Sequence, residues 1–136
     1  MDYNQLLIKQ FQHWALYLHE SQFPNLGRCY ASALRSEADI VTDINPAETE
    51  ELFFKIIPSW HRTVKELYGE CRPNVAILGN LWPHLHAHLV PRHKENKQFY
   101  GIEFADPNPK GLFIDLDRNI SSEILFKIRD EIKKKI

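Results

Sequence analysis

Three histidines alternate with apolar residues in one short stretch of this chain, where Leu85 and Ala87 separate His84, His86 and His88. A β-strand sends successive side chains to opposite faces, so the three imidazoles would line one face, about 6.6 Å apart. Imidazole is the side chain best suited to nucleophilic attack and proton transfer near neutral pH. The row therefore indicates a catalytic face on a strand whose other face is buried.

Two other interpretations of this row stay open. In the first, the three histidines of the row have only a structural role, as single histidines usually do. The four histidines outside the row are expected to be structural in the same way: His13, His19, His61 and His93. In the second, the row binds zinc, which takes histidine nitrogens and in catalytic sites has three protein ligands. All three side chains of one straight strand diverge too far to surround one ion, and no cysteine or aspartate lies nearby in the sequence. Covalent catalysis by histidine is the favoured interpretation.

The pattern His-apolar-His-apolar-His-apolar-apolar, here HLHAHLV followed by PR, resembles the signature of the histidine triad family of nucleotide hydrolases and transferases. The stretch 74–80 is similar to the strand and turn that precede this signature in the family. The stretch 26–35 is similar to the family's early strand with the start of a helix after it. The resemblance covers about residues 12 to 95.

This resemblance implies a role for each histidine of the row. His86 would attack an α-phosphate and form a nucleotidyl-histidine intermediate, which water or another acceptor would resolve. His88 would hydrogen-bond the phosphate or the leaving group, and His84 would orient the network. A backbone carbonyl would hold the second ring nitrogen of the nucleophile. The chemistry agrees, because an imidazole with the usual pKa of about 6.5 is largely neutral at pH 7 and so able to attack. Neither a metal nor another cofactor is implied.

Two departures from the family pattern bear on the substrate. Many members carry a histidine after the glycine of the early strand, whereas here Arg28 follows Gly27. A guanidinium can hold phosphate oxygens in a bidentate fork, so Arg28 is a candidate substrate-binding residue, with a plain surface charge as an equal alternative. In the loop before the row, Asn80 is a second candidate, as an amide donor to phosphate, while Leu81 cannot replace a hydroxyl. Trp82 is expected to pack rather than to wall the site.

Length and composition predict one globular domain over residues 1–136. A net charge of −1 gives no field that would attract nucleic acid or a membrane. No apolar run reaches the ~20 residues of a membrane span, and the first residues do not resemble a signal peptide. Cys29 and Cys71 form no disulfide framework, which favours a reducing, cytoplasmic location.

The periodicity of the chain predicts an α+β domain: an antiparallel sheet of about five strands, one long packed helix and a C-terminal helix. Helix is expected over 3–11, extended chain over 38–41, and a mostly irregular segment over 91–117. The long helix should begin at the cap Asn45, bend at Pro58 and stop near Gly69. Ser121 or Ser122 should cap the last helix. The remaining strands are expected over 14–18, 27–34, 74–79 and 84–90.

The functional expectation is a metal-independent nucleotidyl hydrolase or transferase that acts on an adenylated or dinucleoside polyphosphate substrate. A nucleotide-binding module with little catalysis is one alternative, motivated by Arg28 and the Asn80-Leu81 loop. A dinucleoside polyphosphate phosphorylase and a zinc-dependent hydrolase are two more. Trp14 and Leu18 are candidates for the wall of a base pocket, although core packing is favoured for both. A homodimer is expected by resemblance only.

Overall fold

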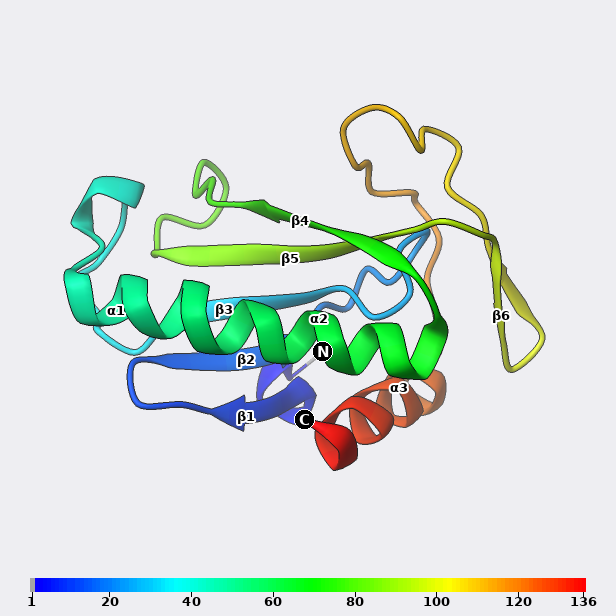
Figure 1. Ribbon diagram of the computed structural model, residues 1–136, viewed down its shortest axis with the longest axis horizontal. Helices are drawn as coiled ribbons and strands as arrows, with labels where there is room; N and C mark the ends of the chain where they lie inside the picture. The colour runs from blue at the N-terminus through cyan, green and yellow to red at the C-terminus, as the bar shows by residue number, and fades with distance from the viewer. Residues whose placement is uncertain (1) are drawn as a thin grey trace.

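One antiparallel sheet organises the computed structural model, which describes residues 2–136 (Figure 1). Its five strands lie in the order β1-β2-β3-β5-β4, and a separate two-stranded sheet pairs β6 with β7. The predicted α+β class, five-stranded antiparallel sheet, long helix and C-terminal helix are all confirmed. In chain order the elements are η1 (Tyr3–Leu6), β1 (Leu7–Gln10), β2 (Trp14–Leu18), β3 (Cys29–Ala33), η2 (Val41–Asp43), α1 (Pro46–Glu51), η3 (Leu52–Ile56), α2 (Ile57–Tyr68), β4 (Cys71–Ala76), β5 (His86–His93), β6 (Lys97–Phe99), β7 (Ile102–Phe104) and α3 (Ser122–Lys135).

A long helix made of α1, η3 and α2 crosses one face of the sheet (Figure 1). It starts at a capping box, in which the Asn45 side chain accepts from the Glu48 N–H at 2.8 Å and Glu48 accepts from the Asn45 N–H at 3.0 Å. The predicted bend at Pro58 takes the form of a π-helical turn, η3, just before it. Proline has no N–H to donate, and a π turn is one way a helix accommodates a break in its ladder. The helix ends at Gly69, whose φ of 98° is easiest for glycine.

The core fills the space between this helix and the sheet. Alternate residues of neighbouring strands meet there in register, as Leu16 with Ala31 and Ala31 with Ala87. These strand side chains are all buried, and so are the side chains of the long helix that pack in the same cluster: Leu52, Ile56, Trp60 and Val64. Trp14 and Leu18 are fully buried in the same cluster, so the favoured expectation of core packing is confirmed for both. Because side chains alternate along a strand, His86 and His88 of β5 lie on the other face of the sheet.

Three local predictions are wrong. Residues 3–11 form the short helix η1 followed by β1, because strand pairing with β2 buries Leu6 and Ile8 and overrides the helical spacing. The prediction of extended chain over 38–41 fails at its end: Ile40 is extended, but Val41 begins η2, where the Asp43 carboxylate accepts from two backbone N–H groups at 3.0 Å. The strand of the histidine row begins at His86, so His84 lies in the bend before it.

The segment after β5 is more ordered than the sequence predicts. It forms the β6–β7 hairpin, and residues 105–121, called the strap below, then return across the end of the sheet to α3 (Figure 1). Arg92 anchors the strap: it donates to the Asp106 carboxylate at 2.7 and 2.9 Å and to the carbonyls of Asn108 and Gly111 at 2.6 and 2.8 Å. Ser121 caps α3, as predicted, by accepting from the Ile124 N–H. Within residues 2–136, no helix has the length and apolar character needed to span a bilayer.

Candidate active site

Two of the three histidines of β5, His86 and His88, lie side by side on the face of the sheet that the long helix leaves uncovered. His86 pairs with Ser32 and His88 with Tyr30 on the neighbouring strand β3, and the two imidazole rings are 4.9 Å apart between centroids. His86 is buried and His88 half-buried. The strand thus brings two imidazoles together in fixed positions.

The hydrogen-bond partners of His86 and His84 define which ring nitrogens carry protons. Nδ1 of His86 lies 2.5 Å from the carbonyl oxygen of His84, and Nε2 of His84 lies 2.8 Å from the carbonyl oxygen of Ala33. A carbonyl oxygen can only accept, so His86 donates through Nδ1–H and keeps a lone pair on Nε2. The resemblance implied a backbone carbonyl that holds the second ring nitrogen of the nucleophile. In this structure it is the carbonyl of His84.

Arg28 reaches the histidine row from the turn just before β3. Its guanidinium is only 2% exposed, its Nη2 lies 3.4 Å from Nδ1 of His88, and its Nη1 donates to the carboxylate of Asp115. Because a guanidinium can only donate, His88 accepts through Nδ1 and carries its proton on Nε2. Burial, followed by the charge of Arg28, lowers the pKa of His88 to about 4. His88 is therefore a neutral hydrogen-bond donor at pH 7.

His19 also belongs to this cluster, although we expected it to be no more than a structural histidine. Its ring centroid is 5.7 Å from that of His88, and its Nδ1 accepts from the Ser21 N–H at 3.0 Å. Burial, followed by Arg28 and His88, lowers the pKa of His19 to about 3. The sequence signal for His19 was its spacing of two residues from Tyr17, which places both side chains on one face of an extended segment. Tyr30 of β3 pairs with Tyr17 on one side and with His88 on the other.

Three aromatic side chains continue the surface beside the histidines and are called the aromatic shelf below. Tyr17 and Tyr30 stack at 5.2 Å, and Trp82 lies 4.6 Å from the His86 ring and 6.2 Å from Tyr30. Trp82 packs against the His86 ring, as expected, and it is also 46% exposed, so it forms part of the wall of this face. Half-exposed aromatic faces of this kind can stack on a nucleobase.

Of the residues singled out from the sequence, His84, His86, His88 and Arg28 come together through the contacts above. Asn80 lies exposed in the loop between β4 and β5, and no side-chain hydrogen bond within residues 2–136 ties it to the others. Among the same residues, no group of three or more histidine, cysteine, aspartate or glutamate side chains is arranged to hold a metal ion. Cys29 and Cys71 are both free thiols, and Cys29 lies in the core.

No family model matches the sequence, and the comparison with curated proteins also gives no match. Solved structures do match. A histidine triad protein from Bradyrhizobium japonicum is 20% identical with a TM-score of 0.67, and the alignment covers 96% of this chain and 89% of that one. A diadenosine triphosphate hydrolase from Plasmodium falciparum is 12% identical with a TM-score of 0.63, over 96% of this chain and 75% of that one.

The NitFhit protein of C. elegans is 15% identical with a TM-score of 0.66; the alignment covers 97% of this chain but only 27% of the NitFhit chain. Identities this low show the fold alone. The fold is that of the histidine triad proteins, as the sequence resemblance predicted. In this structure residues 86–90 of the row HLHAHLV lie on β5, between β3 and β4 in the sheet.

Proposed function

We propose that this protein is a metal-independent nucleotidyl hydrolase or transferase that forms a nucleotidyl-histidine intermediate at Nε2 of His86. The observation that carries the proposal is the hydrogen bond from Nδ1 of His86 to the His84 carbonyl. It leaves the Nε2 lone pair unused on a face that also bears a buried cation and a row of aromatic rings. The proposed substrate class is adenylated compounds and dinucleoside polyphosphates.

In the first step Nε2 attacks the α-phosphorus, and the bond from phosphorus to the leaving group breaks with its electron pair on the leaving group. The imidazole gains positive charge as the new bond forms. The His84 carbonyl, already hydrogen-bonded to Nδ1–H, stabilises that charge without further rearrangement. Water then attacks the phosphorus, loses a proton to solvent and releases the nucleoside monophosphate, which returns His86 to its neutral form.

The remaining groups of the site bind and orient. Nε2–H of His88 donates to a phosphate oxygen, Arg28 contributes a permanent positive charge, and the Asn80 amide is a further proposed donor from the loop. The aromatic shelf stacks on the nucleoside. A homodimer and a cytoplasmic location stay predictions from the sequence.

A second candidate function is a nucleotide-binding module with little catalysis. The contact between Arg28 and Asp115 favours it, because the cation nearest the histidine row is already paired with a carboxylate of the strap. If that pairing persists with nucleotide bound, the phosphates cannot adopt a reactive position. The two candidates differ in turnover, not in nucleotide binding.

The test compares chelator-treated wild-type protein with His86→Asn, using His13→Asn, in the turn between β1 and β2, as the matched control. Each is incubated with adenosine phosphoramidate, diadenosine polyphosphates and ADP, with and without phosphate. We expect AMP from the wild type and from His13→Asn, none from His86→Asn, and a nucleotide adduct on quenched wild-type protein by intact mass. Retained turnover in folded His86→Asn would overturn the mechanism. Products that require phosphate would indicate a phosphorylase, and tight binding without any product would favour the binding module.

A further inference from the structure

Arg28 is a buried permanent charge whose carboxylate partner is exposed. Within residues 2–136 its guanidinium contacts three groups: the Asp115 carboxylate, Nδ1 of His88 and, at 5.3 Å from the centroid, the ring of Phe113. Its Nε is buried without a hydrogen-bond partner among the same residues. A buried cation is costly unless it is well paired. Asp115 is 57% exposed, so the pairing relies on a side chain at the surface.

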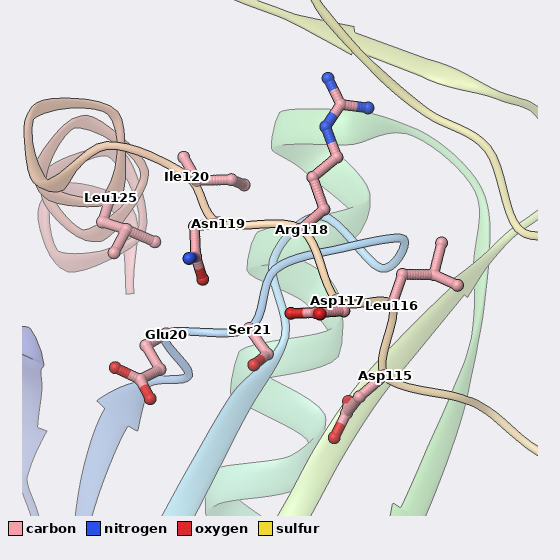
Figure 2. A pocket seen from close by; sticks show the side chains of 9 residues that line it. All are labelled: Glu20, Ser21, Asp115, Leu116, Asp117, Arg118, Asn119, Ile120 and Leu125. Atoms are coloured by element: carbon pink, nitrogen blue, oxygen red, sulfur yellow. The ribbon is translucent and has the colours of Figure 1, made fainter.

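Asp115 has room to move away from Arg28. It lies in the part of the strap between the Arg92 anchor and the Ser121 cap, where most residues are exposed. A surface pocket of about 460 Å³ adjoins it, lined by Glu20, Ser21, residues 115–120 of the strap and Leu125. Figure 2 shows the carboxylates of Asp115 and Asp117 at this pocket, while the guanidinium of Arg118 points away from both. Asp115 can therefore turn into the pocket without disturbing the core.

A carboxylate and a phosphate offer a guanidinium the same pair of acceptor oxygens. The Asp115 carboxylate, whose Oδ1 accepts from Nη1 of Arg28, thus occupies a position that a phosphate oxygen could take, beside His88 on the histidine row. A phosphate next to the one attacked by His86 would reach this position, and its higher charge would compete well against a single exposed carboxylate.

The neighbourhood of His88 also discriminates between kinds of leaving group. With Arg28 at its Nδ1 and with its pKa lowered to about 4, His88 has no proton to give up easily at pH 7. An amine leaving from a phosphoramidate must gain a proton on nitrogen. A phosphate leaving from an anhydride departs as an anion and needs only its charge neutralised, which a guanidinium supplies.

We propose that Arg28 binds the leaving-group phosphate and selects polyphosphate substrates over phosphoramidates, and that Asp115 holds this phosphate position until the substrate displaces it. This inference rests on the proposed attack by His86. The bond from Nε2 to the α-phosphorus forms, the α–β anhydride bond breaks, and its electron pair stays on the bridging oxygen of the leaving phosphate, facing Arg28. No proton transfer is required for departure.

Equilibrium binding in the His86→Asn background tests the phosphate position without requiring turnover. AMP and ADP are titrated into His86→Asn alone and combined with Arg28→Gln, Arg28→Lys, Asp115→Asn or Asp117→Asn. We expect ADP to bind about tenfold or more tightly than AMP, a preference that Arg28→Gln abolishes and Arg28→Lys partly keeps. Asp115→Asn should tighten ADP by roughly threefold to tenfold and leave AMP unchanged, whereas Asp117→Asn should change neither.

Equal affinities for AMP and ADP in the His86→Asn protein would overturn the inference. So would equal effects of Asp115→Asn and Asp117→Asn. Asp115 is exposed, so its variant remains informative if Arg28→Gln does not fold, which circular dichroism would reveal.

Turnover separates this inference from the proposed function. The ratio of kcat/KM for diadenosine triphosphate to that for adenosine phosphoramidate should fall at least tenfold in Arg28→Gln. AMP release by the wild type with an unchanged ratio would overturn the role of Arg28 and leave His86 as the nucleophile. No AMP release by the wild type, with the ADP preference present and lost in Arg28→Gln, would overturn the proposed catalysis and support the phosphate position.

Discussion

Nη2 of Arg28 lies 3.4 Å from Nδ1 of His88; this contact sets the tautomer of the last histidine in the row and adds to the burial that keeps its ring neutral. The guanidinium can only donate, so the proton of His88 is on Nε2, the nitrogen that faces away from Arg28. The same positive charge disfavours a second proton on the ring. Burial and a permanently charged neighbour together therefore make His88 a fixed neutral donor.

Replacing Arg28 should raise the pKa of His88. Burial is the larger cause of the lowered pKa and Arg28 the second, so Arg28→Gln should move it part of the way from about 4 towards the usual 6.5. His86 and Asp115 also act on His88, in opposite directions: His86 lowers the pKa and Asp115 raises it. An NMR titration of the His88 ring protons measures the shift, with Arg35→Gln, which pairs with Glu48, as the control. An unchanged His88 titration in folded Arg28→Gln would show that burial alone is responsible.

The neutral histidines should make the fold sensitive to mild acid. His19, with a pKa near 3, faces Arg28, His88, Asp115 and His86. Between pH 6.5 and 3 the unfolded chain binds a proton at His19 that the folded protein refuses, so the free energy of unfolding should fall as pH falls through this range. Urea denaturation from pH 7 to pH 5 measures the slope.

The control for this acid sensitivity is His19→Gln, which cannot take up the proton in either state. Its free energy of unfolding should depend less steeply on pH than that of the wild type over the same range. Identical slopes for the two proteins would show that His19 does not contribute.

Trp82 should contribute to nucleotide binding. Stacking of a base on an aromatic side chain is worth about 1–3 kcal/mol, so Trp82→Ala should weaken AMP binding roughly tenfold. The neighbouring Leu81 is 99% exposed and contacts little, so Leu81→Ala is the matched control and should leave binding unchanged. Calorimetric titration in the His86→Asn background measures both. Equal affinities of the two variants would remove Trp82 from the nucleoside site.

Removing the donor of His88 should reduce the rate more than it reduces binding. His88→Ala deletes one hydrogen bond to charge that develops during the reaction, for which a loss of about 10²- to 10³-fold in kcat is expected. KM should change much less, because the aromatic shelf and Arg28 are intact. Steady-state kinetics on the best polyphosphate substrate provides both values, and a kcat within a few fold of wild type would assign the donor role elsewhere.

The buried ion pair of Arg92 should contribute more to stability than an exposed one. Asp106 and Arg92 are 12% and 6% exposed, so Asp106→Ala leaves a buried charge without its carboxylate and should cost about 3 kcal/mol or more of unfolding free energy. Asp130 pairs with Arg129 at the surface, and Asp130→Ala should cost at most about 1 kcal/mol. Urea denaturation compares them. Similar costs would mean that the strap is held mainly by other contacts.

Local signals explain which parts of the fold the sequence predicts well. The Asn45 and Ser121 caps and the apolar stripe of the long helix were readable because capping and helical burial depend on residues three or four apart. The N-terminal prediction failed because Leu6, Leu7 and Phe11 fit a helical spacing, whereas residues 7–10 pair with the next strand, β2, and this pairing decides the conformation. The β6–β7 hairpin was missed for another reason: its strands are only three residues long, too short to show an alternating pattern.

The candidate site divides in the same way. The sequence alone determined that His86 and His88 share one face of a strand, since alternation is a property of the extended chain, although it wrongly extended that strand back to His84. It also singled out Arg28 as a charge where many members of the family carry histidine. Tertiary structure decided the rest. Asp115 is 87 residues from Arg28, and Tyr17 and His19 reach the histidine row only through the register of β2 and β3. Such contacts depend on how strands pair and how the strap is anchored, which packing of the whole chain sets and no local spacing encodes.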